Sequence, residues 1–255
     1  MARVLCIDVG NTSAHWGVME DRALLAAGEV PTAEVARALE AGLALGPDGI
    51  SLASVVPAAT EALRPGLVAA GIRVLHLRHD TVVGLGFDYP NPAEVGQDRL
   101  ANCLGAQVMA GAPAIVVDMG TATTFDVLTA KGYAGGVIAP GLAVMTSYLH
   151  GRTALLPRLD PAAVRSGKAV GKSTADAMRA GCALGFAGMI GTILDALLAE
   201  LDAEGAPAPS LLATGGTADF LPPELAARLR HIPHLTLIGL EEAWRRRVEH
   251  SGLAG

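Results

Sequence analysis

Short apolar runs and amphipathic stretches alternate along the first half of the chain. Three runs have the length and β-branched content of buried strands, namely Arg3–Ile7, Ile50–Val56 and Ile72–Leu77. Apolar residues at helical spacing predict helices over Val35–Leu45 and Ala58–Ala70, the second interrupted at Pro65-Gly66. Trp16-Gly17-Val18 is expected to begin a hairpin partner of the first strand. This alternation predicts a parallel or mixed sheet with helices on its faces.

The second half repeats the order of the first. After a loop at Phe87–Glu94 and a helical pattern from Asp98 to Met109, another buried strand begins near Ala114. Its predicted successors are, in chain order, a hairpin of Thr123–Val127 with Val137-Ile138, helices at Leu142–His150 and Ala175–Leu201, and a strand at Ser210–Thr214. With 255 residues and 51% hydrophobic content, the chain can bury two cores of ordinary size. We therefore predict two α/β domains, residues 1–113 and 114–255.

An acidic, glycine-containing turn follows the first strand of each half. The two turns read Asp8-Val9-Gly10-Asn11-Thr12 and Asp118-Met119-Gly120-Thr121-Ala122-Thr123-Thr124. In each, a strand delivers a carboxylate to its end, and the glycine lets backbone N–H groups approach an anion. Asp8 has the chemistry to hold hydrated Mg²⁺, which prefers one or two carboxylates together with phosphate oxygens. Two matched copies favour phosphate binding over ordinary turns.

Three further segments are candidates for ligand contact, each with a structural alternative. Asp98 at a helix start is either a base for a substrate hydroxyl or a complement to the helix dipole, beside an arginine, Arg99, suited to a carboxylate or phosphate. Thr214-Gly215-Gly216 is an open turn that can lie against an adenine or ribose. Ser173 or Thr174 either caps the next helix or contacts a ligand.

Charge and cysteine content argue against a nucleic-acid-binding protein and favour a cytosolic one. A net charge of -6 and a pI near 5.6 argue against a nucleic-acid partner. The basic cluster Arg245–Arg247 lies among glutamates, which favours a solvated helix face. Three distant cysteines, Cys6, Cys103 and Cys182, are typical of buried thiols in a reduced cytosolic protein. The apolar run Ala180–Leu194 is shorter than the roughly 20 residues of a bilayer span and is interpreted as a buried helix, so we expect a cytoplasmic protein without membrane contact.

The motifs, taken in order, resemble those of type III pantothenate kinase over nearly the whole chain. They are Asp8 to Thr12, Ser54-Val55-Val56-Pro57, Tyr89 to Arg99, Asp118 to Asp126, Gly135 to Gly141, Gly171 to Thr174, and Thr214-Gly215-Gly216. The resemblance implies the actin, sugar-kinase and heat-shock-chaperone superfamily, in which two duplicated ribonuclease-H-like (actin-like) domains close a nucleotide cleft around ATP. It also implies phosphorylation of pantothenate, the first step of coenzyme A synthesis, by a homodimer that uses Mg²⁺ and K⁺ or NH₄⁺.

The resemblance assigns a role to each candidate residue. ATP phosphates and Mg²⁺ would be held by the first turn and its continuation, Asp8, Val9, Gly10, Asn11, Thr12, Ser13, Ala14 and His15, with Asp8 reaching Mg²⁺ through water. Asp98 would accept the substrate proton. The pantothenate pocket would be lined by Tyr89, Gly96, Gln97, Asp98 and Arg99, with Arg99 on the carboxylate, and by Thr174 from across the dimer. Asp118 would bind the monovalent cation, Thr121 would contact ATP, and Gly215 and Gly216 would face the adenosine.

Two other functions remain open from the sequence. One is a non-catalytic regulatory factor on the same fold, and the other is a superfamily kinase or phosphohydrolase for a different small molecule. Glycines along the long apolar helix, Gly181, Gly185, Gly188 and Gly191, permit close helix packing at a dimer seam or in an internal core. No role is assigned to the segment Trp244–Gly255, and His15, His150 and His234 are expected to be structural apart from the contact that the resemblance gives His15.

Overall fold

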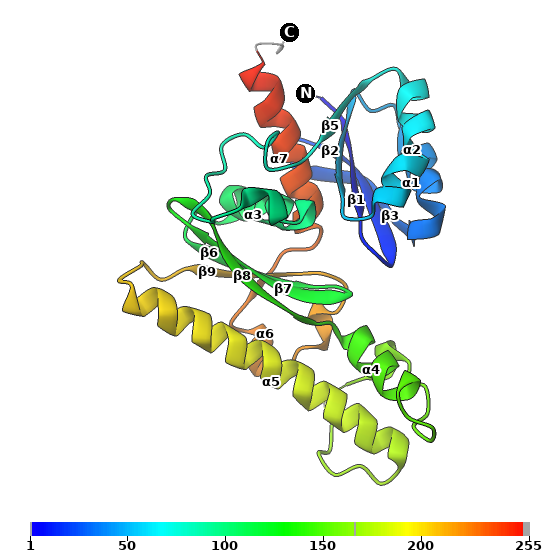
Figure 1. Cartoon of the computed structure of the whole chain (residues 1–255), viewed down its shortest axis with the longest axis vertical. Coiled ribbons are helices and arrows are strands. Elements are labelled where there is room, and N and C mark those ends of the chain that lie inside the picture. The colour runs from blue at the N-terminus through cyan, green and yellow to red at the C-terminus, as the bar shows by residue number, and fades with distance from the viewer. Residues whose placement is uncertain (1, 166, 252–255) are drawn as a thin grey trace. The chain divides into compact units, whose positions relative to one another are not determined.

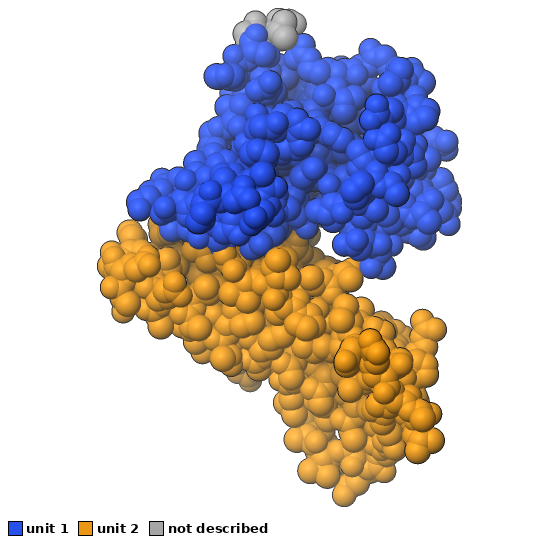
Figure 2. Space-filling view, in the orientation of Figure 1, with its two compact units in different colours: residues 1–112, 128–135, 234–255 blue, residues 113–127, 136–233 orange. Residues whose placement is uncertain are grey.

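The computed structural model describes residues 2–165 and 167–251. Two compact units divide the chain (Figure 2). The first unit contains the chain up to Ala112, residues 128–135, and the chain from His234 onward; the second unit contains residues 113–127 and 136–233. The sequence-based division after residue 113 places the C-terminal segment in the second domain. In the structure that segment belongs to the first unit, because its helix covers the first sheet.

The first sheet has five strands in the order β3-β2-β1-β4-β5 (Figure 1). Their bounds are β1 Val4–Val9, β2 Ser13–Glu20, β3 Ala23–Pro31, β4 Gly49–Ser54 and β5 Arg73–His76. The strands β1 to β3 form an antiparallel meander, whereas β4 pairs in parallel with both β1 and β5. The predicted hairpin and parallel strands are confirmed, and β3 is an edge strand that the sequence analysis missed.

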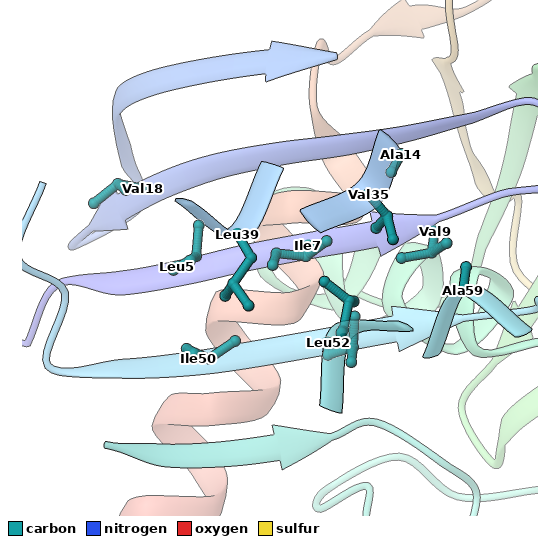
Figure 3. Close-up of a cluster of buried hydrophobic side chains, with 11 residues drawn as sticks. Leu5, Ile7, Val9, Ala14, Val18, Val35, Leu39, Ile50, Leu52 and Ala59 are labelled. Atoms are coloured by element: carbon teal, nitrogen blue, oxygen red, sulfur yellow. The ribbon is translucent and has the colours of Figure 1, made fainter. Parts of the chain in front are cut away.

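Helices α1, Val35–Leu43, and α2, Pro57–Ala70, cover one face of this sheet (Figure 1). Alternate residues of β1, Leu5, Ile7 and Val9, point to that face and meet Leu39 of α1 in a buried apolar cluster (Figure 3). The predicted break at Pro65-Gly66 is wrong, since α2 continues through both residues. Gly66 packs directly on Leu39, and a Cβ there would lie 2.7 Å from its Cδ2, so helix packing outweighs the hydrogen bond lost at Pro65.

The opposite face carries α3, Gln97–Met109, and α7, Leu235–His250 (Figure 1). The two helices approach closely because Gly239 lies on the backbone of α3, where a Cβ would overlap the carbonyl of Ala101. On β4, Gly49 leaves the space that the ring of Trp244 fills. The C-terminal helix is therefore part of the core of the first unit, a role that the sequence analysis did not assign.

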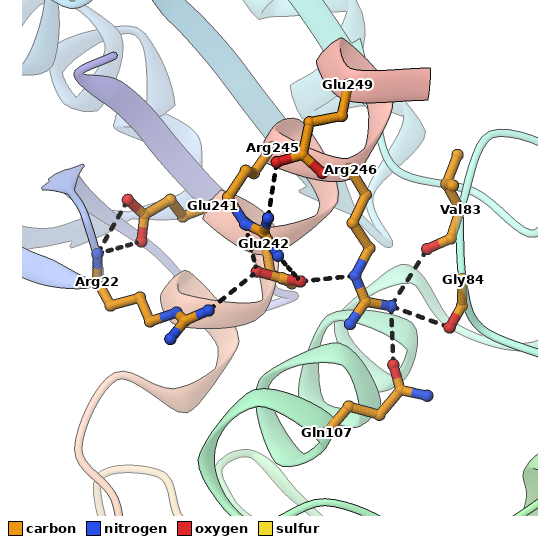
Figure 4. A network of polar contacts seen from close by, with 9 residues as sticks. All are labelled: Arg22, Val83, Gly84, Gln107, Glu241, Glu242, Arg245, Arg246 and Glu249. Carbon is orange, nitrogen blue, oxygen red and sulfur yellow. Dashed lines mark hydrogen bonds and ion pairs between the residues drawn. The ribbon is translucent and has the colours of Figure 1, made fainter. Parts of the chain in front are cut away.

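A buried carboxylate anchors α7 (Figure 4). The Glu242 side chain is 3% exposed and accepts hydrogen bonds from Arg245 and Arg246. Arg246 also donates to the carbonyls of Val83 and Gly84 and to Gln107. The predicted solvated face therefore holds for Arg245 and Arg247, which are exposed, but is wrong for Arg246. That guanidinium is drawn inward by a buried charge and three oxygen acceptors.

The second sheet repeats the topology of the first, with the order β10-β9-β6-β7-β8. Its strands are β6 Ala114–Met119, β7 Ala122–Thr129, β8 Gly132–Pro140, β9 Ser210–Thr214 and β10 Arg230–His231. As in the first sheet, a three-strand meander is followed by two strands added in parallel, here β9 on β6 and β10 on β9. The predicted duplication of an α/β fold is confirmed.

The helices of the second unit are α4 Leu142–Gly151, α5 Thr174–Ala203 and the short α6 Pro223–Ala226. Helix α5 runs along one side of the second sheet (Figure 1). It buries every fourth residue of this stretch, namely Met178, Cys182, Phe186, Ile190 and Leu194. The predicted helix over Ala175–Leu201 is confirmed, but the expectation that its apolar run Ala180–Leu194 is buried is wrong. Helix α5 has 30 residues, enough by length and composition to cross a membrane, and 22% of its most apolar window is buried.

Replacing Glu242 tests the anchor of α7. Burial alone raises the pKa of Glu242, but hydrogen bonds from Arg245 and Arg246 outweigh it and lower that pKa overall. Glu242→Gln should reduce the free energy of unfolding by about 3–5 kcal/mol, because it removes the buried charge that balances the largely buried Arg246 guanidinium. Urea unfolding at neutral pH measures the loss, which should shrink as pH falls and the wild-type carboxylate is protonated.

The matched control is Glu249→Gln, which removes another carboxylate bound to Arg245. Glu249 is 56% exposed, so its loss should cost less than about 1 kcal/mol. Equal effects of the two substitutions would contradict the assignment of Glu242 as the anchor.

Candidate functional site

The first acidic turn lies at the carboxyl end of β1. Asp8 is the second-to-last residue of β1 and is partly buried. The loop that follows is closed by the Gly10 N–H, which donates to the Ser13 carbonyl at 3.0 Å. The Thr32 hydroxyl donates to the Gly10 carbonyl at 2.7 Å and fixes the loop from the other side. Asn11 and Thr12 are exposed at its tip. The turn therefore presents the polar residues Asn11 and Thr12 to solvent, while hydrogen bonds at Gly10 hold its backbone.

The remaining residues of this predicted phosphate segment differ in exposure. Val9 and Ala14 are fully buried, so only their backbone atoms are suited to a ligand. His15 is exposed on β2, with its Nε2 3.2 Å from the Ser13 hydroxyl and 3.8 Å from Glu29. These neighbours give the His15 side chain partners within its own sheet. Its contact with ATP stays a prediction.

A hydrogen bond brings the start of α3 to the same sheet edge. In the parallel pair of β1 and β4, Val9 lies beside Ser54, and the Ser54 N–H donates to the Gln97 side chain at 2.8 Å. Gln97 is the first residue of α3, so Asp98 and Arg99 lie in the helix turn next to the ends of β1 and β4. Residues that are far apart in sequence, Asp8 and Asp98, are thus brought to one edge of one unit.

Asp98 has the properties of a proton acceptor. Burial raises the pKa of its carboxyl group, although a 2.9 Å hydrogen bond from the Arg99 N–H and the charge of Arg99 oppose the shift. Gly96 leaves space for the carboxylate, because a Cβ there would lie 2.5 Å from Asp98 Oδ1. A partly buried carboxylate with a raised pKa, next to the acidic turn of β1, can take a proton from a hydroxyl.

An aromatic pair borders Arg99. The Arg99 guanidinium lies over the Tyr133 ring, 5.4 Å from its centroid, and Tyr133 meets Tyr89 edge to face at 5.4 Å. Tyr89 was expected here and Tyr133 was not. An aromatic residue between glycines at the start of β8 was the available signal, because such glycines permit the close docking that brings the ring to the site.

The second acidic turn is built in the same way at the carboxyl end of β6. Asp118 pairs with Thr214 in the parallel register of β6 and β9, so the Gly215 turn lies beside the carboxylate. Gly215 has φ +92, and a Cβ there would lie 2.7 Å from Asp118 Oδ1. Thr217, which the sequence analysis also missed, donates from its N–H and its hydroxyl to the Met119 carbonyl. Asp118, Gly215 and Gly216 are therefore neighbours.

Thr121 is exposed at the tip of this second turn. The Gly120 N–H donates to the Ala122 carbonyl, and the Gly141 N–H donates to the Thr121 carbonyl, both at 3.0 Å. A Cβ at Gly141 would overlap the carbonyls of Gly120 and Thr121, so the Pro140-Gly141 turn packs flat against the loop. Thr121 is held at the same edge as Asp118.

Ser173 and Thr174 have different positions at the start of α5. The Ser173 hydroxyl caps the helix, accepting from the Asp176 N–H at 3.1 Å and donating to the Asp176 carboxylate at 2.7 Å. Thr174 is exposed as the first residue of the helix. Ser173 is therefore the helix cap. Thr174 makes none of the contacts described above for the two acidic turns, so its substrate contact stays a prediction.

Among residues 2–165 and 167–251, no three His, Cys, Asp or Glu side chains cluster as a metal site. Single carboxylates such as Asp8 and Asp118 fit a hydrated Mg²⁺ or a monovalent cation that completes its shell with water, carbonyls or phosphate oxygens.

The sequence is similar throughout to known type III pantothenate kinases. A family model described as type III pantothenate kinase matches residues 4–196. A type III pantothenate kinase from Akkermansia muciniphila is 40% identical over 245 residues, covering 94% of this chain and 97% of the relative. One from Frankia casuarinae is 38% identical over 255 residues, covering 96% of this chain and all of the relative.

Solved structures share the fold at low sequence identity. A Campylobacter jejuni protein named for the Baf family of transcriptional activators has a TM-score of 0.59 at 21% identity, covering 97% of this chain and 98% of its own. A ROK family glucokinase from Streptomyces griseus, in complex with glucose and AMPPNP, has a TM-score of 0.59 at 12% identity, covering 95% and 99%. They support two ribonuclease-H-like domains. From the family match and these relatives, the chain belongs to the type III pantothenate kinase family.

Proposed function

We propose that this protein transfers the γ-phosphoryl group of ATP to the primary hydroxyl of pantothenate, the first step of coenzyme A synthesis. The observation that carries the proposal is the partly buried Asp98 carboxylate, held next to the acidic turn of β1 by the Ser54–Gln97 hydrogen bond. Family membership supplies the substrate and the nucleotide. Phosphoryl transfer asks mainly for positioning and charge neutralisation, which this arrangement offers.

The chemical step follows from these residues. Asp98 accepts the proton of the substrate hydroxyl as its oxygen bonds to the γ-phosphorus, and the bond from that phosphorus to the bridging oxygen breaks to release ADP. Arg99 pairs with the carboxylate at the other end of pantothenate through its planar fork. Gln97 and Gly96 keep the helix start and the Asp98 carboxylate in place.

The two turns bind the nucleotide in this proposal. Asn11, Thr12 and the backbone of residues 8–15 hold the phosphates, with Asp8 toward hydrated Mg²⁺, which would neutralise phosphate charge. Asp118 binds K⁺ or NH₄⁺, Thr121 contacts ATP, and the Gly215-Gly216 turn faces the adenosine. The contact of Gly215 with the Asp118 carboxylate supports a shared site for cation and nucleotide.

A homodimer would complete the pantothenate pocket through Thr174. The exposed face of α5 carries Gly181, Gly185 and Gly188, where a Cβ would meet nothing within 4 Å, and Leu184, which is 54% exposed. Small residues and an exposed leucine at helical spacing support close packing with a second copy. In this proposal the partner covers this face of α5, and the protein is a soluble, cytoplasmic enzyme in which α5 does not span a membrane. The non-catalytic alternative is supported by no observation and is not retained.

Replacing Asp98 tests the proton acceptor. Asp98→Asn should lower kcat by about 10²–10⁴-fold, because the amide cannot accept the proton. Wild-type turnover should fall as pH drops through the raised pKa of Asp98, above the range of an ordinary aspartate. Because ionised Asp98 costs stability once pH exceeds that pKa, Asp98→Asn should have an equal or higher Tm at neutral pH, with the difference vanishing in acid.

The control is Asp80→Asn, which changes an exposed carboxylate paired with Arg78 and should keep the wild-type kcat. Wild-type activity in Asp98→Asn would refute the role.

ATP turnover in different salts tests the substrate and the monovalent cation. ADP formation with Mg²⁺ should require pantothenate and should be faster in K⁺ than in Na⁺. Asp118→Asn should abolish the preference for K⁺ and raise the KM for ATP, whereas Asp219→Asn, which changes a carboxylate that is 85% exposed, should preserve both. Hydrolysis independent of pantothenate would contradict the proposed substrate, and a K⁺ preference retained in Asp118→Asn would contradict only the cation site.

Sedimentation velocity tests the dimer. Gly188→Trp places a bulky side chain on the exposed face of α5, at a position where a Cβ meets nothing within 4 Å, so it should convert dimer to monomer and raise the KM for pantothenate. Glu200→Trp, at an exposed position near the end of the same helix, should remain dimeric. A dimeric Gly188→Trp variant with normal kinetics would show that this face is not the interface.

A further inference from the structure

The hairpin between β7 and β8 docks against the segment that precedes α3. Tyr133 forms a parallel bridge with Phe87; its N–H donates to the Gly86 carbonyl at 2.9 Å, and the Asp88 N–H donates to its carbonyl at 2.8 Å. Gly132, at φ +118, lies directly on Gly86, where a Cβ would overlap the Gly86 backbone. Backbone contact this close fixes where the Tyr133 side chain begins.

The Tyr133 ring occupies a space with little freedom. Its side chain is among the largest that are fully buried, with the residue 1% exposed, and it lies edge to face with Tyr89. The Arg99 guanidinium lies over the same ring, 5.4 Å from the centroid. Tyr133 therefore joins two residues of the proposed pantothenate pocket, although it comes from the second half of the chain and belongs by its contacts to the first unit.

An arginine that binds a carboxylate through two hydrogen bonds needs the plane of its guanidinium group to be fixed. A free arginine side chain samples many rotamers, and a fork that must meet two oxygens loses affinity when its orientation varies. The face of a buried aromatic ring restricts a guanidinium without competing for its N–H donors, because the attraction comes from the ring quadrupole. Tyr133 supplies such a face and is itself immobilised by Tyr89 and by the glycine contact.

We propose that Tyr133 is a positioning residue that orients Arg99 for the carboxylate of the substrate and so makes the enzyme selective for acids over uncharged analogues. The inference rests on the proposed function, because it takes the Arg99 ligand to be the pantothenate carboxylate. In this role the face of the Tyr133 ring acts on Arg99, and it affects substrate binding more than the chemical step at Asp98.

Steady-state kinetics of Tyr133→Phe and Tyr133→Leu test this role. The Phe variant keeps the ring and should keep the KM for pantothenate within about twofold of wild type, whereas the Leu variant should raise it about tenfold, within the range of cation–π strengths. The KM for ATP should not change, and kcat should change by less than about threefold. With pantothenyl alcohol, which lacks the carboxylate, Tyr133→Leu should perform like the wild type.

Two controls separate positioning from a general structural effect. Lys131→Gln alters the same hairpin at an exposed side chain paired with Asp88 and should leave the KM for pantothenate unchanged. In an Arg99→Lys background, which keeps the charge but loses the planar fork, adding Tyr133→Leu should raise the KM by less than about twofold. Thermal unfolding of each variant checks that it is folded; if Tyr133→Leu unfolds, Tyr133→Met gives the same comparison with a flexible side chain.

The outcomes distinguish this inference from the proposed function. A wild-type protein without pantothenate-dependent turnover refutes the proposed function, and the inference with it. An active wild type whose Leu variant keeps its KM for pantothenate, or loses activity equally with the alcohol, refutes the positioning role alone. A tenfold rise that is the same in the wild-type and Arg99→Lys backgrounds also refutes it, because Tyr133 would then act independently of Arg99.

Discussion

Parallel strand pairing at the centre of each sheet is the constraint on which the candidate site depends. In the first sheet the pairing of β1 with β4 places Val9 beside Ser54, and in the second the pairing of β6 with β9 places Asp118 beside Thr214. Parallel strands end at the same sheet edge, so the loops that follow them converge there. Each acidic turn therefore meets a second segment from far along the chain, which supplies Asp98 in one unit and the Gly215 turn in the other.

Close packing of α7 and α3 links the core of the first unit to the position of Asp98 and Arg99. Gly239 lets α7 lie against α3, and the buried Glu242 holds α7 through Arg245 and Arg246. Helix α3 is then fixed at its start by the Gln97–Ser54 hydrogen bond, which sets the position of Asp98 and Arg99. The C-terminal helix thus supports the proposed proton acceptor although it contributes no ligand to it. Burial of Asp98 raises its pKa, the direction that a base for a hydroxyl proton needs.

Strong local patterns allowed most of the fold to be predicted from the sequence. Apolar strands, two acidic turns and their matched order predicted both repeats and made Asp8 and Asp118 candidate residues. Asp98 and Gly215 became candidates from a helix start and a glycine turn, and the roles of all four stay predictions. The misses have physical causes. Strand β3 is an exposed edge with weak alternation, and α2 tolerates Pro65 because Gly66 packs on Leu39. The glycines around Tyr133 were a signal, but they did not reveal its partners Tyr89 and Arg99, which are far away in sequence. The apolar run of α5 was expected to be buried because one sequence does not show what lies on its apolar side.

The central claim is that a partly buried aspartate beside an acidic turn lets this protein phosphorylate the hydroxyl of a small acid. Mass spectrometry and phosphorus NMR of the product formed from pantothenate, ATP and Mg²⁺ test it most directly. The account predicts one phosphate ester on the primary hydroxyl, formed by the wild type and not by a folded Asp98→Asn variant. A phosphate on the secondary hydroxyl, an acyl phosphate on the carboxylate, or the same ester at the wild-type rate from the variant would contradict it.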